Sequence, residues 1–159
     1  MRNKPKIEYV FGNEALLDNI RFLWQSLNQY HLDLSPCFKQ DYVETNFEKR
    51  KAFFLKKAES AELRVDIAVD AVTKQNVAYC VSSIDEEKTG EIESIFVASN
   101  YRGLGIGDSL VRRVLAWMDE KGTISKIVEV AAGNEQAFGF YSRYGFFARR
   151  TVLKQIKKG

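Results

Sequence analysis

The chain has 159 residues, 45% of them hydrophobic, which suffices for one well-buried core and is too short for two ordinary domains. The formal net charge is +3, and no basic run is denser than residues 49–51, which excludes the charge footprint of a nucleic-acid-binding protein. No apolar run approaches the roughly 20 residues that span a bilayer. Two distant cysteines, Cys37 and Cys80, indicate neither a disulfide framework nor a metal site, and they favour a reducing, cytoplasmic compartment.

The first elements in chain order are a strand and two helices. Residues 6–11 predict a strand, and Asn13 can cap the segment that follows. Apolar residues recur at helical spacing through residues 16–30, which predicts an amphipathic helix. After a loop at residues 33–40, a second helix is predicted at roughly residues 42–60.

From Glu62 onward the apolar period changes to two. Residues 63–69 and 77–84 alternate in this way around a polar turn, which predicts a hairpin. Residues 105–121 carry the clearest amphipathic helix, and Gly122 is placed to end it. The other predicted elements are strands at residues 91–97, 126–131 and 146–155 and a short helix at residues 135–144.

The turn between the strand at residues 91–97 and the helix at residues 105–121 contains Gly103, Gly105 and Gly107. Backbone without Cβ atoms can approach a ligand closely, and the first turn of a helix offers unpaired N–H groups with a partial positive charge. The turn therefore predicts a pyrophosphate cradle. Its G-x-G-x-G spacing, followed by Asp108, fits neither the dinucleotide fingerprint nor the P-loop. A purely structural corner is the alternative.

Two blocks of this sequence resemble the GNAT acetyltransferases. In the first, Arg102, Gly105 and Gly107 match the family signature [QR]-x-x-G-x-[GA]. The second block resembles the family's next strand and the F-Y-x-x-x-G-F helix, and it consists of Asn134, Phe140, Tyr141, Gly145 and Phe146. The resemblance covers roughly residues 65–155.

This resemblance implies one α/β domain of the GNAT fold over residues 1–159. The expected sheet is mixed but mostly antiparallel, has about six to seven strands and about four flanking helices, and splays at the strands that begin near Glu91 and Lys126. The family resemblance also favours a homodimer.

The resemblance further implies acetyl-CoA as a cosubstrate. The amides of residues 104–108 would hold its pyrophosphate, and residues 95–97 would pair with the pantetheine arm like an added strand, beside a bulge. The positions expected to contact the cofactor are Ile95, Phe96, Val97, Arg102, Gly103, Leu104, Gly105, Ile106, Gly107, Asp108, Asn134 and Tyr141. No metal is expected.

Attack on a thioester requires a neutral amine, whereas a free alkylamine has a pKa of about 10, so a base must remove a proton. Glu91 and Glu93 share one face of their strand because side chains alternate. Glu93 is preferred because the run from Glu93 to Val97 resembles the spermidine/spermine-type members, and Glu91 is the alternative. For both Glu91 and Glu93, the alternative is a solvent-exposed strand residue with no role in catalysis.

Tyr141 is the candidate acid, because a phenol is neutral at pH 7 and the family places a tyrosine near the CoA sulfur. Packing in an aromatic core is the alternative for this residue. The candidate acceptor-binding residues are Trp24, Tyr30, His31 and Glu93, although His31 can equally cap its helix and Trp24 can belong to the core.

The sequence therefore predicts an acetyl-CoA-dependent N-acetyltransferase that acts on a primary amine of a small molecule, such as a polyamine or an amino acid, by direct attack on the thioester. A non-catalytic acyl-CoA-binding regulatory module, a nucleotide-binding interaction protein and an enzyme that acetylates a protein amine are the alternatives. Retention of both Tyr141 and a strand glutamate favours the enzyme.

Overall fold

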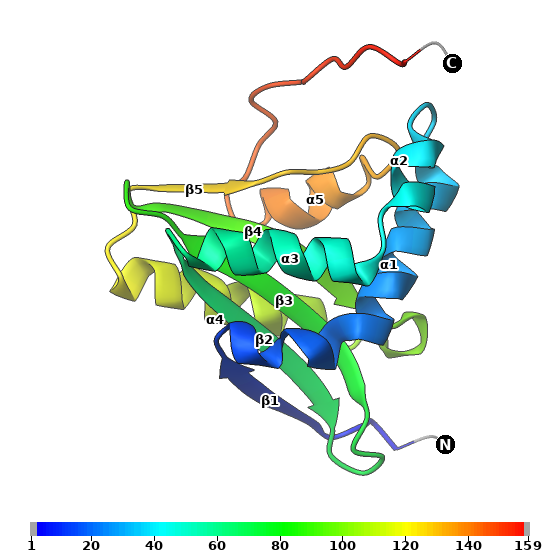
Figure 1. Ribbon diagram of the computed structural model, residues 1–159. Helices are drawn as coiled ribbons and strands as arrows, with labels where there is room; N and C mark the ends of the chain where they lie inside the picture. Colours follow the sequence, from blue (N-terminus) through cyan, green and yellow to red (C-terminus); the bar gives the residue numbers. More distant parts are fainter. Residues whose placement is uncertain (1–2, 158–159) are drawn as a thin grey trace.

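A computed structural model describes residues 3–157 and shows a five-stranded sheet with helices on both faces (Figure 1). The strands lie side by side in chain order: β1 (Ile7–Gly12), β2 (Glu62–Asp70), β3 (Asn76–Ile84), β4 (Thr89–Val97) and β5 (Ser125–Val128). Neighbouring strands pair antiparallel up to β4, and β4 pairs with β5 in parallel. The mixed, mostly antiparallel α/β sheet is confirmed, but the expected six to seven strands were too many.

Within residues 3–157, five α-helices and two 3₁₀ segments accompany the sheet, rather than about four helices. They are η1 (Glu14–Ile20), α1 (Arg21–Leu34), α2 (Lys39–Glu44), α3 (Phe47–Ala58), η2 (Ser99–Tyr101), α4 (Ile106–Glu120) and α5 (Ala137–Ser142). Asn13 caps η1 as predicted, accepting a hydrogen bond from the Ala15 amide at 3.0 Å. The helix predicted at residues 42–60 is divided, because the Asn46 side chain accepts from the Lys49 amide and starts a new helix there.

The sheet separates two apolar clusters. On one face, α4 and α5 bury residues such as Leu110, Val114 and Tyr141 against Cys80 and Ile92 of β3 and β4. On the other face, η1, α1 and α3 pack against the alternate residues of β2 and β3. Successive residues of the strands therefore point into two different cores, one on each face of the sheet.

The strand predicted at residues 146–155 does not form. Residues 146–157 carry no strand, and the exposed fractions of Phe147 and Leu153 are 78% and 91%. The neighbouring edge strand β5 ends at Val128 and offers only a short ladder, and the alternation of apolar residues in this last segment is weak. The helix predicted at residues 135–144 and the strand predicted at residues 126–131 are also shorter than expected.

β4 contains a bulge, and it separates from β5 beyond that point. Ser94 lies opposite Val81 and Ile92 lies opposite Ser82, so Glu93 is an extra residue in β4. Pairing between β4 and β5 ends at Ile92 and Val128, which confirms the predicted splay. From residue 93 to 97, no strand in the described part of the chain pairs with β4 on the β5 side.

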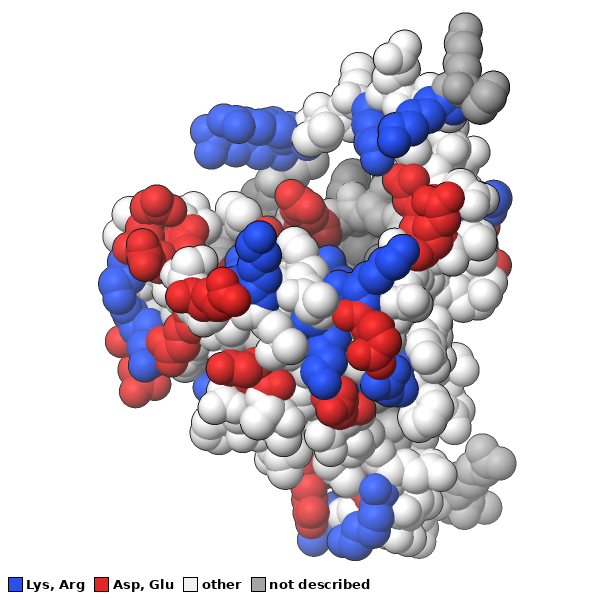
Figure 2. Space-filling model, viewed as in Figure 1, with Lys and Arg blue, Asp and Glu red and all other residues white. Residues whose placement is uncertain are grey.

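Charges of both signs are interspersed over the face that α3 covers (Figure 2). No helix within residues 3–157 combines the length and apolar character needed to cross a membrane. In the same part of the chain, no cluster of three or more His, Cys, Asp or Glu side chains could hold a metal ion.

Candidate active site

A cleft of about 1080 Å³ opens where β4 and β5 part. The first turn of α4 and residues of α5 line one end, and α1, α2 and α3 line the other. The expected site residues that line it are Trp24, Tyr30, His31, Glu93, Ile95, Phe96, Val97, Arg102, Gly103, Gly105, Ile106, Gly107, Asp108, Asn134 and Tyr141. Glu91 and Leu104 lie outside the lining, and Leu104 packs against the apolar cluster beside α4.

The glycine-rich turn owes its shape to left-handed backbone. Gly103 and Gly105 have φ angles of +77° and +80°, which L side chains rarely adopt, and Gly105 is the N-cap of α4. The Ser109 amide bonds to the Gly105 carbonyl at 3.0 Å, so the amides before Ser109 lie in the turn where a helix has no internal acceptors for them. Gly107 differs, since a Cβ there would make only ordinary contacts.

The charged side chains at this turn have hydrogen-bond partners within the chain. Arg102 donates from Nε to the Val97 carbonyl at 3.0 Å. The Asp108 carboxylate accepts hydrogen bonds from the Tyr144 hydroxyl and from Arg112, and these bonds lower its pKa. The negative charge at the start of α4 is thereby bound by its own neighbours, while the backbone N–H groups remain at the cleft.

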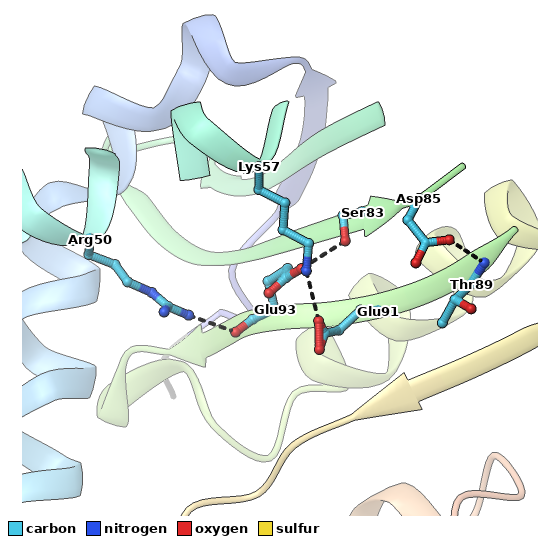
Figure 3. Close-up of polar contacts among 7 residues, drawn as sticks. All are labelled: Arg50, Lys57, Ser83, Asp85, Thr89, Glu91 and Glu93. Carbon is cyan, nitrogen blue, oxygen red and sulfur yellow. Dashed lines mark hydrogen bonds and ion pairs between the residues drawn. The ribbon is translucent and has the colours of Figure 1, made fainter. Parts of the chain in front are cut away.

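The two candidate bases form one ionic network with a residue that the sequence did not single out. The Lys57 ammonium on α3 contacts the Glu93 carboxylate and lies 2.9 Å from Glu91 Oε2 (Figure 3). Ser83 donates to Glu93 Oε1 at 2.7 Å. The two glutamates do share a face of β4, as predicted, and that face is turned toward α3.

Burial and competing charges set the proton affinities in this network. Burial raises the pKa of Glu91, and the Glu93 charge raises it further against the opposing effect of Lys57. Burial alone would lower the pKa of Lys57, but its hydrogen bonds to the two glutamates outweigh burial and raise it. The Glu93 side chain is only 5% exposed.

Tyr141 lies at the cleft within an aromatic cluster. Its ring is 7% exposed and makes edge contacts with Phe140 and Phe146, whose centroids are 5.1 and 6.0 Å away. Burial raises the pKa of the Tyr141 phenol, which therefore keeps its proton at neutral pH. The ring thus belongs to the core and borders the cleft at the same time.

The four predicted acceptor residues all line the cleft, and one of them, Trp24, belongs to the core as well. Trp24 is 5% exposed and packs on Phe47, so it serves mainly the core. The Tyr30 hydroxyl donates to Asn134 Oδ1 at 3.3 Å and accepts from Gln136, which joins α1 to the loop after β5. This contact occupies Asn134, a predicted cofactor residue.

His31 lies beside Tyr42 at the end of the cleft that α1, α2 and α3 line, with the ring centroids 5.7 Å apart. Burial, and secondarily the charge of Arg50, lowers the pKa of the His31 imidazole, so the ring is neutral at pH 7. Arg50 lines this end as well and was missed by the sequence reading, because it stands within a charged stretch that resembles a solvated helix face.

Comparison with known proteins identifies relatives of this architecture. The model of the acetyltransferase (GNAT) family matches residues 24–146. An uncharacterized N-acetyltransferase of Methanocaldococcus jannaschii is 34% identical over 49% of this chain, and the matched segment spans 36% of that protein. N-alpha-acetyltransferase 50 of Danio rerio is 29% identical over 88% of this chain and 76% of its own length.

A solved structure of the aminoglycoside N-acetyltransferase AAC(6')-Iy in complex with CoA has a TM-score of 0.70, with 100% of this chain and 99% of that chain covered. At 17% identity, this likeness is one of fold. Neither the family match nor these relatives singles out the spermidine/spermine type.

Proposed function

The chain belongs to the acetyltransferase (GNAT) family, and on that premise we propose that it transfers the acetyl group of acetyl-CoA to a primary amine of a small molecule. The observation that carries this proposal is the continuous cleft, which joins the amide-lined turn before α4 to the ionic network at the β4 bulge. The free edge of β4 lies between them.

Acetyl-CoA fits one end of the cleft. The amides of residues 105–108 would hold the pyrophosphate, because the left-handed glycines direct backbone rather than side chains toward the cleft. The unpaired edge of β4 from residue 95 to 97 would bind the pantetheine arm as an added strand does. The thioester would then lie beside the bulge at Glu93.

The amine would attack the thioester carbonyl carbon directly. A new N–C bond forms, the tetrahedral intermediate collapses, and the C–S bond breaks to release the CoA thiolate. We assign proton removal from the amine to Glu93 acting through a water molecule, because Glu93 lines the cleft whereas Glu91 does not. Lys57 and Ser83 would orient this carboxylate.

The departing thiolate would take a proton from the Tyr141 phenol. The raised pKa of Tyr141 keeps the proton available across the neutral range. Its ring is fixed by the neighbouring aromatic side chains, which would hold the hydroxyl near the sulfur.

A protein α-amine is the second candidate acceptor, and the relationship to N-alpha-acetyltransferase 50 over most of the chain favours it. An acetyl-transfer screen distinguishes the two. Polyamines, amino acids, aminoglycosides and N-terminal peptides would be offered with acetyl-CoA, while thiol release is recorded and products are weighed by mass spectrometry. We expect an acetylated small amine. Thiol release without any acetylated amine, or no release at all, would contradict the proposal.

A further inference from the structure

Arg50 extends from α3 toward the bulge of β4, about two helical turns before Lys57 on the same helix face (Figure 3). Its Nη2 atom donates to the Glu93 carbonyl oxygen at 3.2 Å. The ring centroids of Phe53 and Phe54 lie 4.8 and 4.5 Å from the guanidinium carbon, and the two rings hold the group in place. Arg50 is therefore a fixed cation in the wall of the cleft.

The two cations of this helix face have different partners. Lys57 binds both glutamates of β4, whereas Arg50 forms no ion pair with any carboxylate of residues 3–157. Burial lowers the pKa of Arg50, yet a guanidinium stays charged at any physiological pH. A partly buried cation that no carboxylate contacts directly loses hydration without the gain of a direct ion pair, and most of its N–H donors remain available.

Several carboxylates surround this end of the cleft, and the charges of Glu93, Glu91 and Glu129 favour the charged form of Arg50, although none of the three forms an ion pair with it. Asp41 forms an ion pair with Lys154, in which Oδ2 and Nζ are 3.3 Å apart. The two glutamates of β4 form ion pairs with Lys57. His31 is neutral because burial lowers its pKa. Glu129 is an exposed carboxylate that lines the cleft in the loop after β5 without pairing with Arg50.

We infer that the acceptor is an amino-acid-like small molecule, with a carboxylate close to its amine, and that Arg50 binds this carboxylate. The inference rests on the proposed function and names its substrate class. A guanidinium presents a planar fork of donors that matches a carboxylate in two parallel hydrogen bonds. Polyamines and aminoglycosides lack such a group and would bring further positive charge to Arg50.

The position of Arg50 also explains how binding would promote the reaction. Arg50 is hydrogen-bonded to the backbone of Glu93, which lies beside the expected position of the thioester. A carboxylate held there places an amine that is separated from it by one or two carbon atoms within reach of the thioester carbonyl. Fixing both groups in this geometry lowers the entropic cost of the attack. Glu129 would receive the ammonium as the molecule enters the cleft.

Calorimetry on the protein saturated with CoA tests the inference through binding alone. The ligands are a set of N-acetyl-amino acids, which stand for the product, each paired with its carboxamide. We expect the free acid of the preferred side chain to bind at least tenfold more tightly than its amide, about 1.4 kcal/mol. Arg50→Gln should abolish this preference, and Arg50→Lys should retain part of it because the charge persists.

Arg21→Gln is the matched control, because Arg21 lies over the Phe47 ring and pairs with Glu48 outside the cleft. It should leave the preference for the acid intact. CoA affinity, measured in the same instrument, reports whether each variant is folded. If Arg50→Gln fails this check, the reduced preference of Arg50→Lys decides the question.

Three results would overturn the inference: equal or tighter binding of the amides, a preference that survives in Arg50→Gln, or no binding by either member of any pair. These outcomes differ from failure of the proposed function. Absence of acetyl transfer to every amine would refute the function, even if carboxylates bind selectively. Efficient acetylation of amines that lack a carboxylate would refute only the substrate class.

Discussion

The two ends of the cleft are built from different parts of the chain. At the α4 end, backbone makes the surface: two glycines with positive φ present amides, and the carboxylate of Asp108 is bound by Tyr144 and Arg112. At the α3 end, side chains make the surface through the network of Lys57 and its two glutamates. The first end should therefore respond to changes of backbone conformation, and the second to changes of charge.

The largest effect is expected from Glu93→Gln at the side-chain end. Without the proposed base, kcat should fall about a hundredfold at neutral pH. The loss should shrink as pH rises toward the amine pKa of about 10, because solvent then deprotonates the acceptor. A pH profile of kcat checks this, with Glu91→Gln as the control that retains most activity. An equal loss at every pH would make Glu93 a structural residue.

Tyr141→Phe tests the proposed acid, which lies on α5 in the lining of the cleft. The variant keeps the ring and its contacts with Phe140 and Phe146, so packing is preserved. We expect kcat to fall about tenfold to a hundredfold while the Kd for acetyl-CoA changes by only a few fold. Steady-state kinetics and calorimetry separate the two quantities. Wild-type kcat would remove the phenol from the reaction.

Gly105→Val tests the backbone end. A β-branched residue is strained at a φ of +80°, so the turn should shift and acetyl-CoA affinity should fall about tenfold, or about 1.4 kcal/mol. Gly122→Val is the matched control, because Gly122 has a φ of +72° and equally open surroundings but lies outside the cleft. Calorimetry should show weakened binding in the first variant alone. Equal affinities would separate the turn from CoA.

Lys57→Met should give the smallest effect, a loss of about 1 kcal/mol in the free energy of unfolding at neutral pH. Without the ammonium, the pKa of Glu91 should rise further above its unfolded value. A folded state with the higher pKa binds more protons, so the variant regains stability as pH falls through that pKa. Urea denaturation at about pH 5 and pH 7.5 checks the direction. A deficit that grows on acidification would contradict it.

The shape of the turn at the α4 end could be predicted from sequence because local rules determine it. Gly103 and Gly105 occur just before a strongly amphipathic helix, and both adopt the left-handed backbone that their position requires. The bulge and the splay were expected from the family resemblance alone, since nothing in the residues around Glu93 distinguishes an extra residue from ordinary alternation.

Trp24, Tyr30, His31 and Glu93 were expected at the α3 end and line the cleft there, but the ionic contacts of this end escaped prediction because they join residues far apart in the chain. Lys57 and Arg50 belong to a charged segment whose sequence is typical of a solvent-exposed helix. Their contacts with β4 form only because α3 packs over the sheet. The unformed strand at residues 146–155 has a related cause. Strand propensity is a local property of the sequence, whereas a strand also needs a neighbouring edge long enough to pair with.

A crystal structure of the protein with CoA is the most direct test of the central claim, that one cleft joins the α4 turn to the β4 bulge as an acetyl-transfer site. We predict that pyrophosphate oxygens accept hydrogen bonds from the amides of residues 105–108. The pantetheine should pair with the β4 edge at residues 95–97, and the sulfur should lie beside the Tyr141 hydroxyl. CoA bound elsewhere, or with its sulfur directed away from Glu93 and Tyr141, would contradict the account.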